Sequence, residues 1–223
     1  MATPAHNFEQ PHDRSARLYQ LGLTEAILEM VVLRGLAQRQ ACTAFHTPAA
    51  PGTRQWEECH VGLRELLTPL DWKPTDAGGF SRVISPDGRR AITVATGDRN
   101  TGLIKDDGLY GPVQPRTKYS KGRQTRIAVR ANQQLALLDA RDQPAAESDG
   151  AIWQETRYLL VATTDDEVRY ELSLPSEQDE KGFIVSWSER IVFPAIDIAT
   201  FNTQFDDDDS DGGDGIDIPV VRI

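Results

Sequence analysis

The chain has 223 residues, of which 39% are hydrophobic and 26% charged, with a formal net charge of −10 and a pI near 4.9. This composition is typical of a globular protein with one substantial core and excludes an extensively disordered chain. No apolar run approaches the roughly 18–20 residues of a membrane span, so we expect no membrane association. The acidic average argues against nucleic-acid binding by the surface as a whole.

The first 13 residues are polar, with two prolines and two of the four histidines, so we expect a flexible lead-in. A basic region followed by an apolar block, the mark of a secretory signal, is missing. With only Cys42 and Cys59, the chain has no disulfide framework. A reducing compartment is the simplest interpretation, and we predict a cytoplasmic location.

Two helices are expected next. Ser15 or Thr24 can cap a helix, and apolar residues recur with a period near 3.6 from Leu23 onward, which predicts a helix over about residues 24–45. The stretch TPAAPG breaks it. A second helix is expected over about residues 53–68, capped by Thr53 and burying Trp56. The short connection predicts an antiparallel helical hairpin.

After the second helix, apolar and polar residues alternate with the period of 2 that is typical of strands. A turn at Pro86-Asp87-Gly88 joins the first two, and Asp165-Asp166 turns the clearest hairpin. The expected strands are Phe80–Ser85, Arg90–Thr96, Thr125–Arg130, Trp153–Thr163, Val168–Leu174 and Phe183–Phe193, with Leu135–Asp139 as a further short strand or helical turn. Helices followed by a run of strands predict an α+β fold, a single domain over residues 14–205 with a mainly antiparallel sheet of five or six strands at about residues 80–193.

A basic segment lies inside this acidic chain. Between Gly97 and Arg130 there are eight Lys or Arg residues and three acidic ones. In a strand over Thr125–Arg130, alternate side chains would place Arg126 and Arg130 on one polar face, next to the loop before it. Cations around an aromatic ring can neutralise phosphates and stack a base. The candidate ligand residues are Arg116, Lys118, Tyr119, Lys121, Arg123, Arg126 and Arg130.

Other chemistry has weaker support. Asp98, in the stretch TGDRNTG where a strand should end, could position a ligand, although an ordinary turn explains it equally well. Cys42, His46, Cys59 and His60 do not have a standard zinc spacing, so we interpret them as buried helical cysteines with surface histidines. The tail matches only the first half of a calcium loop. We therefore predict neither a metal nor a cofactor, and we expect the four scattered tryptophans to anchor the core.

The C-terminal residues 206–223 combine an aspartate run with an apolar end, and we expect an acidic disordered tail. Its candidate interaction residues are Asp206, Asp207, Asp208, Asp209, Ile218 and Val220. The apolar end could add to an exposed sheet edge of a partner or dock on its own sheet.

Three functions remain open from the sequence. The first is a non-enzymatic binding or regulatory protein that contacts a phosphate-rich ligand, above all nucleic acid, through the basic segment, with the tail competing for it. The second is a protein–protein adaptor or DNA-mimicking inhibitor that works through its acidic surface and tail. The third is a metal-dependent phosphodiester-cleaving enzyme, which would use Asp87 or Asp98.

Overall fold

The computed structural model describes residues 5–104, 113–120, 122–135 and 154–201. The helices are α1 (Pro11–Leu21), α2 (Glu25–Gln40), α3 (Ala50–Leu67) and α4 (Arg123–Leu135), with short 3-10 turns at Thr68–Leu70 and Ala77–Gly79. The strands are β1 (His6–Phe8), β2 (Lys73–Thr75), β3 (Arg82–Ile84), β4 (Arg90–Thr96), β5 (Glu155–Thr163), β6 (Glu167–Gln178), β7 (Ile184–Val192) and β8 (Ile196–Asp197). The α+β class is confirmed.

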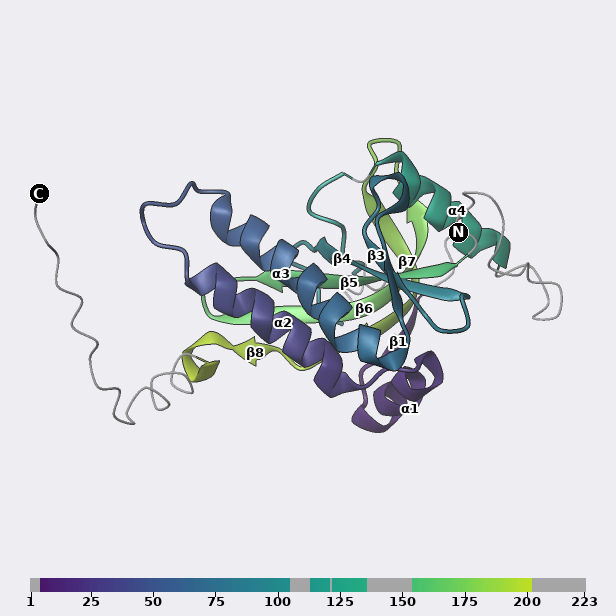
Figure 1. Cartoon of the computed structure of the whole chain (residues 1–223), viewed down its shortest axis with the longest axis horizontal. Helices are drawn as coiled ribbons and strands as arrows, with labels where there is room; N and C mark the ends of the chain where they lie inside the picture. The colour runs from purple at the N-terminus through teal and green to yellow at the C-terminus, as the bar shows by residue number, and fades with distance from the viewer. Residues whose placement is uncertain (1–4, 105–112, 121, 136–153, 202–223) are drawn as a thin grey trace, which may run out of the picture.

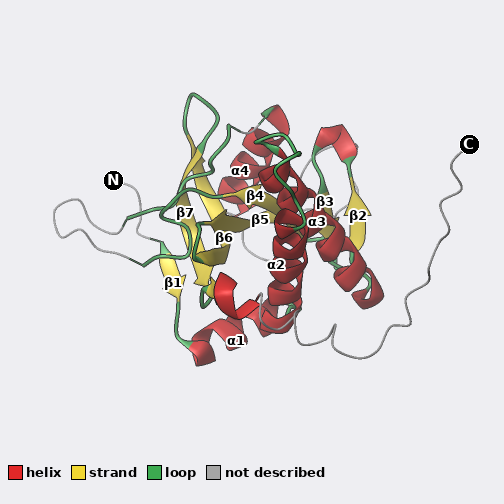
Figure 2. Cartoon of the chain, turned by 90° about the vertical axis from the view of Figure 1, so that its left-hand side faces the viewer, coloured by secondary structure: helices red, strands yellow, loops and turns green. Residues whose placement is uncertain are grey.

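All eight described strands belong to one sheet, in the order β1-β7-β6-β5-β4-β3-β2, with β8 paired to β6. Two pairs are parallel, β1 with β7 and β4 with β5, and the others are antiparallel. Five of the strands expected from the sequence are present as β3 to β7, and the short strands β1, β2 and β8 are added to them. Figure 2 shows the sheet passing behind α2 and α3, from β1 and β7 on one side to β2 and β3 on the other.

Helices cover both faces of the sheet. Along β5, Leu159 and Val161 belong to the larger core with α1, α2 and α3, whereas Tyr158 and Leu160 pack with Ala128 of α4. Because successive strand residues point to opposite faces, α4 lies on the face opposite α2 and α3. Figure 1 shows α2 and α3 lying side by side across the strands, with α4 beyond them at the upper right. None of the described helices is both long and apolar enough to span a membrane.

The helical hairpin is confirmed as the packed pair α2–α3, with shifted ends. The Thr24 hydroxyl caps α2 by accepting a hydrogen bond from the Ile27 N–H at 3.3 Å, and the helix ends at Gln40 rather than near residue 45. The second helix starts at Ala50 with a proline in its first turn, so Thr53 lies inside it and is not its cap. The hairpins at Gly88 and at Asp165-Asp166 are also as expected.

The N-terminal region differs from the expected lead-in. His6–Phe8 form β1 against β7, and α1 follows from Pro11, a helix that the sequence interpretation did not include. The helix ends at Gly22, whose left-handed backbone (φ 73°) favours glycine. The Arg14 guanidinium then donates to the Val192 carbonyl at 3.2 Å and pairs with Glu25 at 2.9 Å. These contacts join the N-terminal residues to β7 of the sheet and to the start of α2.

The strand predicted at Thr125–Arg130 is wrong, because these residues lie within α4. Thr125, Ala128, Val129 and Asn132 are buried, a helical spacing of three and four, while Arg126 and Arg130 are exposed. The alternating β-branched residues Thr125, Ile127 and Val129 suggested a strand, but six residues are too few to separate a period of 2 from one of 3.6. Leu135 is the last residue of α4, and the rest of Leu135–Asp139 lies outside the described residues.

Candidate functional site at the ends of β4 and β5

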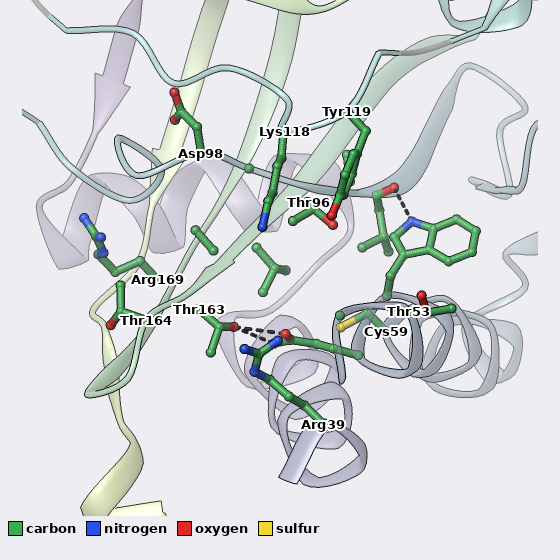
Figure 3. Close-up of a pocket in the computed structure, with 18 of the residues that line it drawn as sticks. Arg39, Thr53, Cys59, Thr96, Asp98, Lys118, Tyr119, Thr163, Thr164 and Arg169 are labelled. Atoms are coloured by element: carbon green, nitrogen blue, oxygen red, sulfur yellow. Dashed lines mark hydrogen bonds between the residues drawn. The ribbon is translucent and has the colours of Figure 1, made fainter. Parts of the chain in front are cut away.

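A cavity of about 710 Å³ lies at the carboxyl ends of the parallel strands β4 and β5, beneath α3. These ends lie side by side, since Thr96 is in register with Val161. In open sheets with parallel strands, ligands usually bind outside the carboxyl ends of the strands. The volume falls within the roughly 300–1,000 Å³ of small-molecule sites. Position and size together make this cavity the candidate functional site (Figure 3).

One wall of the cavity comes from α3 and is mostly apolar. Cys59 and Trp56 of α3 line it together with Val94 and Val161 of the strands, and the Trp56 indole N–H donates to the Val94 carbonyl at 3.2 Å. The Gln55 amide forms two hydrogen bonds with the Thr163 hydroxyl, at 2.8 and 3.0 Å. These bonds fix α3 over the strand ends.

Cys59 is not a candidate nucleophile. It is buried, and this burial raises the pKa of its thiol to about 12. Since the thiolate is the reactive form, almost none is present near neutral pH. The cavity therefore offers apolar surface on this side rather than a reactive group.

The opposite wall is built by the chain after β4. The Gly97 N–H donates to the Val161 carbonyl at 2.9 Å, and the Lys118 N–H donates to the Thr96 carbonyl at 2.8 Å. A bridge between Gly97 and Thr117 holds the two segments together. A Cβ at Gly97 would lie only 1.9 Å from the Thr101 hydroxyl oxygen, so this tight path requires glycine. Lys118 and Tyr119 are thereby placed at the cavity.

A buried ion pair anchors the same loop from below. Glu171 of β6 and Arg190 of β7 are both buried, with the Arg190 Nε at 3.0 Å from a Glu171 carboxylate oxygen. The Gly102 N–H donates to Glu171 at 2.9 Å, and Arg190 donates to the Leu103 carbonyl at 3.0 Å. Because the pair also satisfies backbone groups of the loop, it fixes the route of the chain leaving β4.

Four cations line the cavity, against one carboxylate. They are Arg39, Arg99, Lys118 and Arg169, and the carboxylate is Asp98. Arg169 is held by Glu167 at 3.1 Å and by the Arg99 carbonyl at 3.0 Å. Within the described residues, the other three cations form no ion pair.

Figure 3 shows how these charges are arranged. Lys118 and Tyr119 extend from the same segment into the cavity, and Arg39 enters from the opposite side. The Asp98 carboxylate points away from the Lys118 ammonium, so it does not neutralise that charge. One Asp98 oxygen accepts the Asn100 N–H at 3.0 Å, which fits the ordinary turn considered for this residue. The cavity is therefore a cationic site within an acidic protein.

The structure divides the basic patch expected from the sequence. Lys118 and Tyr119 line the cavity, but Arg116 pairs with Asp179 at 2.9 Å and lies over the Phe183 ring. Arg126 and Arg130 are exposed on α4, which packs on the opposite face of the sheet. Lys121 and the side chain of Arg123 lie outside the described part of the chain.

The sequence interpretation missed Arg39, Arg169 and the role of Trp56. Trp72 and Trp187 are core residues as expected, whereas Trp56 is 38% exposed and lines the cavity; Trp153 is outside the described residues. Besides the basic segment, the sequence pointed to this cavity only through the stretch TGDRNTG, which contains Asp98 and Arg99 at a strand end. Residues on α2 and β6 reach the site only through tertiary packing.

The other candidate residues are dispersed. Asp87 belongs to the β3–β4 turn and pairs with Arg90 at 2.7 Å. Partial burial of the carboxyl group acts to raise its pKa, but hydrogen bonds from Ser85, Arg90 and the Arg89 N–H outweigh burial and lower the pKa to about 2. Contrary to expectation, His60 is buried. Across the described ranges, no three His, Cys, Asp or Glu side chains are grouped as metal ligands would be. The tail residues Asp206, Asp207, Asp208, Asp209, Ile218 and Val220 lie outside those ranges.

A second cavity of about 610 Å³ lies beside α4, at the opposite ends of the β4–β5 pair. Its charged lining is balanced, with Asp87 and Glu155 against Arg89 and Arg90. It thus lacks the excess of one charge that distinguishes the first cavity.

Searches with protein-family models, among curated proteins and among solved structures find no match to this chain.

Proposed function

We propose that the protein binds a phosphate-bearing ligand, with nucleic acid or its nucleotides as the source, in the cavity at the ends of β4 and β5. The observation that carries this proposal is a group of three cations, Arg39, Arg99 and Lys118, around a hollow of about 710 Å³, none of which forms an ion pair with another described residue. Unpaired cations that converge on a cavity favour an anion there, and charge-assisted hydrogen bonds to phosphate are among the strongest in proteins.

The cavity makes the expectation from the sequence more specific. A net charge of −10 repels polyanions from most of the surface, so contact with phosphate depends on a local concentration of cations. Such a group of cations lines the cavity, where the basic segment contributes the Lys118 cation and, next to it, the neutral ring of Tyr119. Arg126 and Arg130, on the other side of the sheet, are not part of this site.

Binding of a short labelled single-stranded oligonucleotide and of ribose phosphate, at two salt concentrations, tests the proposal. Each of Lys118→Ala and Arg39→Ala should weaken binding by about ten-fold or more, because a hydrogen bond to a charged group contributes about 1.5–3 kcal/mol. Binding should also weaken as salt is added.

The matched control is the double variant Arg126→Ala with Arg130→Ala, which removes two exposed cations outside the cavity. It should leave affinity nearly unchanged. A larger loss in the control than in the cavity variants would place the ligand on α4 and contradict the proposal, as would undetectable binding to every phosphate compound.

A further inference from the structure

The cavity presents aromatic surface next to its cations. Trp56 is 38% exposed and Tyr119 is 58% exposed, although most large apolar side chains of the described chain are buried. The indole N–H of Trp56 is already bonded to the Val94 carbonyl, and its ring meets His60 edge-on, with 4.7 Å between ring centroids. What Trp56 leaves accessible is therefore the apolar part of a ring held in a fixed orientation.

A fixed, partly exposed indole suits a planar ligand group. Ring stacking gains favourable contact without reordering the side chain, since the bond to Val94 already holds it. Tyr119 adds a second ring, and the Lys118 ammonium lies 5.8 Å from its centre. Lys118 and Tyr119 are adjacent in the chain and both enter the cavity (Figure 3). The site thus combines a place for an anion with a place for a flat ring.

We infer that the site takes one unpaired nucleotide, whose base stacks on Trp56 or Tyr119 while its phosphate contacts Lys118 and Arg39. This inference rests on the proposed function and narrows it to a ligand with an exposed base. The cavity volume suits a single nucleotide, whereas a base inside a duplex is covered on both faces by its neighbours. The source is a free mononucleotide or an unpaired nucleotide of a single strand.

The first test measures how much the base contributes to binding affinity. Calorimetric titration compares AMP, ribose phosphate and inorganic phosphate. AMP should bind at least about five-fold more tightly than ribose phosphate, the lower end of what stacking on an aromatic side chain provides. If ribose phosphate and AMP bound equally, this inference would fail and the proposed function would stand. If no phosphate compound bound, both would fail.

The second test removes the rings. Trp56→Leu and Tyr119→Leu should each reduce the preference for AMP over ribose phosphate, while Tyr19→Leu, at an 85% exposed position on α1, should leave it unchanged. Tyr119 is exposed, so its variant serves the same purpose if loss of the Trp56 bond prevents folding. An unchanged preference in Tyr119→Leu and in any folded Trp56 variant would overturn the inference.

The third test separates the two sources. AMP and a short single-stranded oligonucleotide compete with a labelled oligonucleotide, in parallel with the same sequence as a blunt duplex. Competition by the single strand at lower concentration than AMP identifies a strand as the ligand, and the reverse identifies the mononucleotide. A duplex that competes as well as the single strand would overturn the inference, because its bases are not free to stack on the protein.

Discussion

At Gly35 the two main helices pack closely against each other. A Cβ built there would lie 2.4 Å from the Cys59 sulfur and 2.9 Å from the Gln55 carbonyl oxygen, both in α3. Gln55 and Cys59 also line the cavity, so this single position sets the distance between α2 and α3 and thereby the shape of one cavity wall. In the sequence Gly35 looks like a weakness in a helix, since glycine is an unfavourable helix residue.

We expect Gly35→Ala to destabilise the protein by about 1–3 kcal/mol, because the added methyl must push the backbone of α3 away from α2. Gly52→Ala is the matched control: it lies in α3, and a Cβ there meets nothing within 4 Å. That substitution should be neutral or slightly stabilising. Urea unfolding followed by circular dichroism measures both. Equal stability of the two variants would show that the helices can separate without cost.

The helix α4 shows how a whole element docks through one side chain. The buried Asn132 amide donates to the Thr156 carbonyl at 3.1 Å and accepts the Thr156 N–H at 2.9 Å. The side chain thus occupies the place of a neighbouring strand residue at the start of β5. It also donates to the Pro175 carbonyl of β6 at 3.4 Å, which joins α4 to both strands beneath it.

Asn132→Ala should cost about 2–4 kcal/mol, because it leaves buried backbone groups of Thr156 without partners. The adjacent Gln133 is exposed and, among the described residues, donates to the Ser176 carbonyl alone, so Gln133→Ala should change stability by less than about 1 kcal/mol. Thermal unfolding of the two variants against the unaltered chain gives the comparison. A small loss in Asn132→Ala, similar to that in Gln133→Ala, would mean that water replaces the lost bonds.

Elements with a long, consistent pattern were predictable. The apolar period of α2, the turn before β4 and the hairpin of β5 and β6 each depend on neighbours in the chain, and the structure confirms all three. The helix α4 was not predictable from the sequence. Its β-branched residues favour a strand locally, and the helix forms because one of its faces packs against the sheet. The residues that line the cavity divide in the same way: Lys118 and Tyr119 belong to a basic segment that is visible in the sequence, whereas Arg39 and Arg169 reach the cavity by packing.

At the scale of the whole molecule, charge is unevenly distributed. Seven of the aspartates lie after Phe205, while the strand-end cavity carries cations that form no ion pair with the described residues. A segment attached to the same chain competes for those cations at roughly millimolar effective concentration, provided that it reaches them. The acidic tail expected from the sequence would then modulate binding at the proposed site.

A chain that ends at Phe205 should bind the oligonucleotide about two- to ten-fold more tightly at low salt, with a steeper dependence on salt, because the competing carboxylates are gone. The control keeps the length and replaces the seven tail aspartates with asparagine, which should have the same effect. Anisotropy titrations at two salt concentrations measure both. Unchanged affinity in the two chains would exclude the tail as a regulator of this site.

The pairing of β1 with β7 has a consequence for how the protein is made. His6–Phe8 are in register with Glu189–Ile191, and Arg14 reaches the Val192 carbonyl. During translation α2 and α3 leave the ribosome early and contact each other through residues close in sequence, but β1 has no partner until β7 has been synthesised. For most of that time the nascent chain has apolar residues of α1 and the central strands without their native cover. We therefore expect the nascent chain to be most open to aggregation and to chaperones just before β7, the last long strand, emerges.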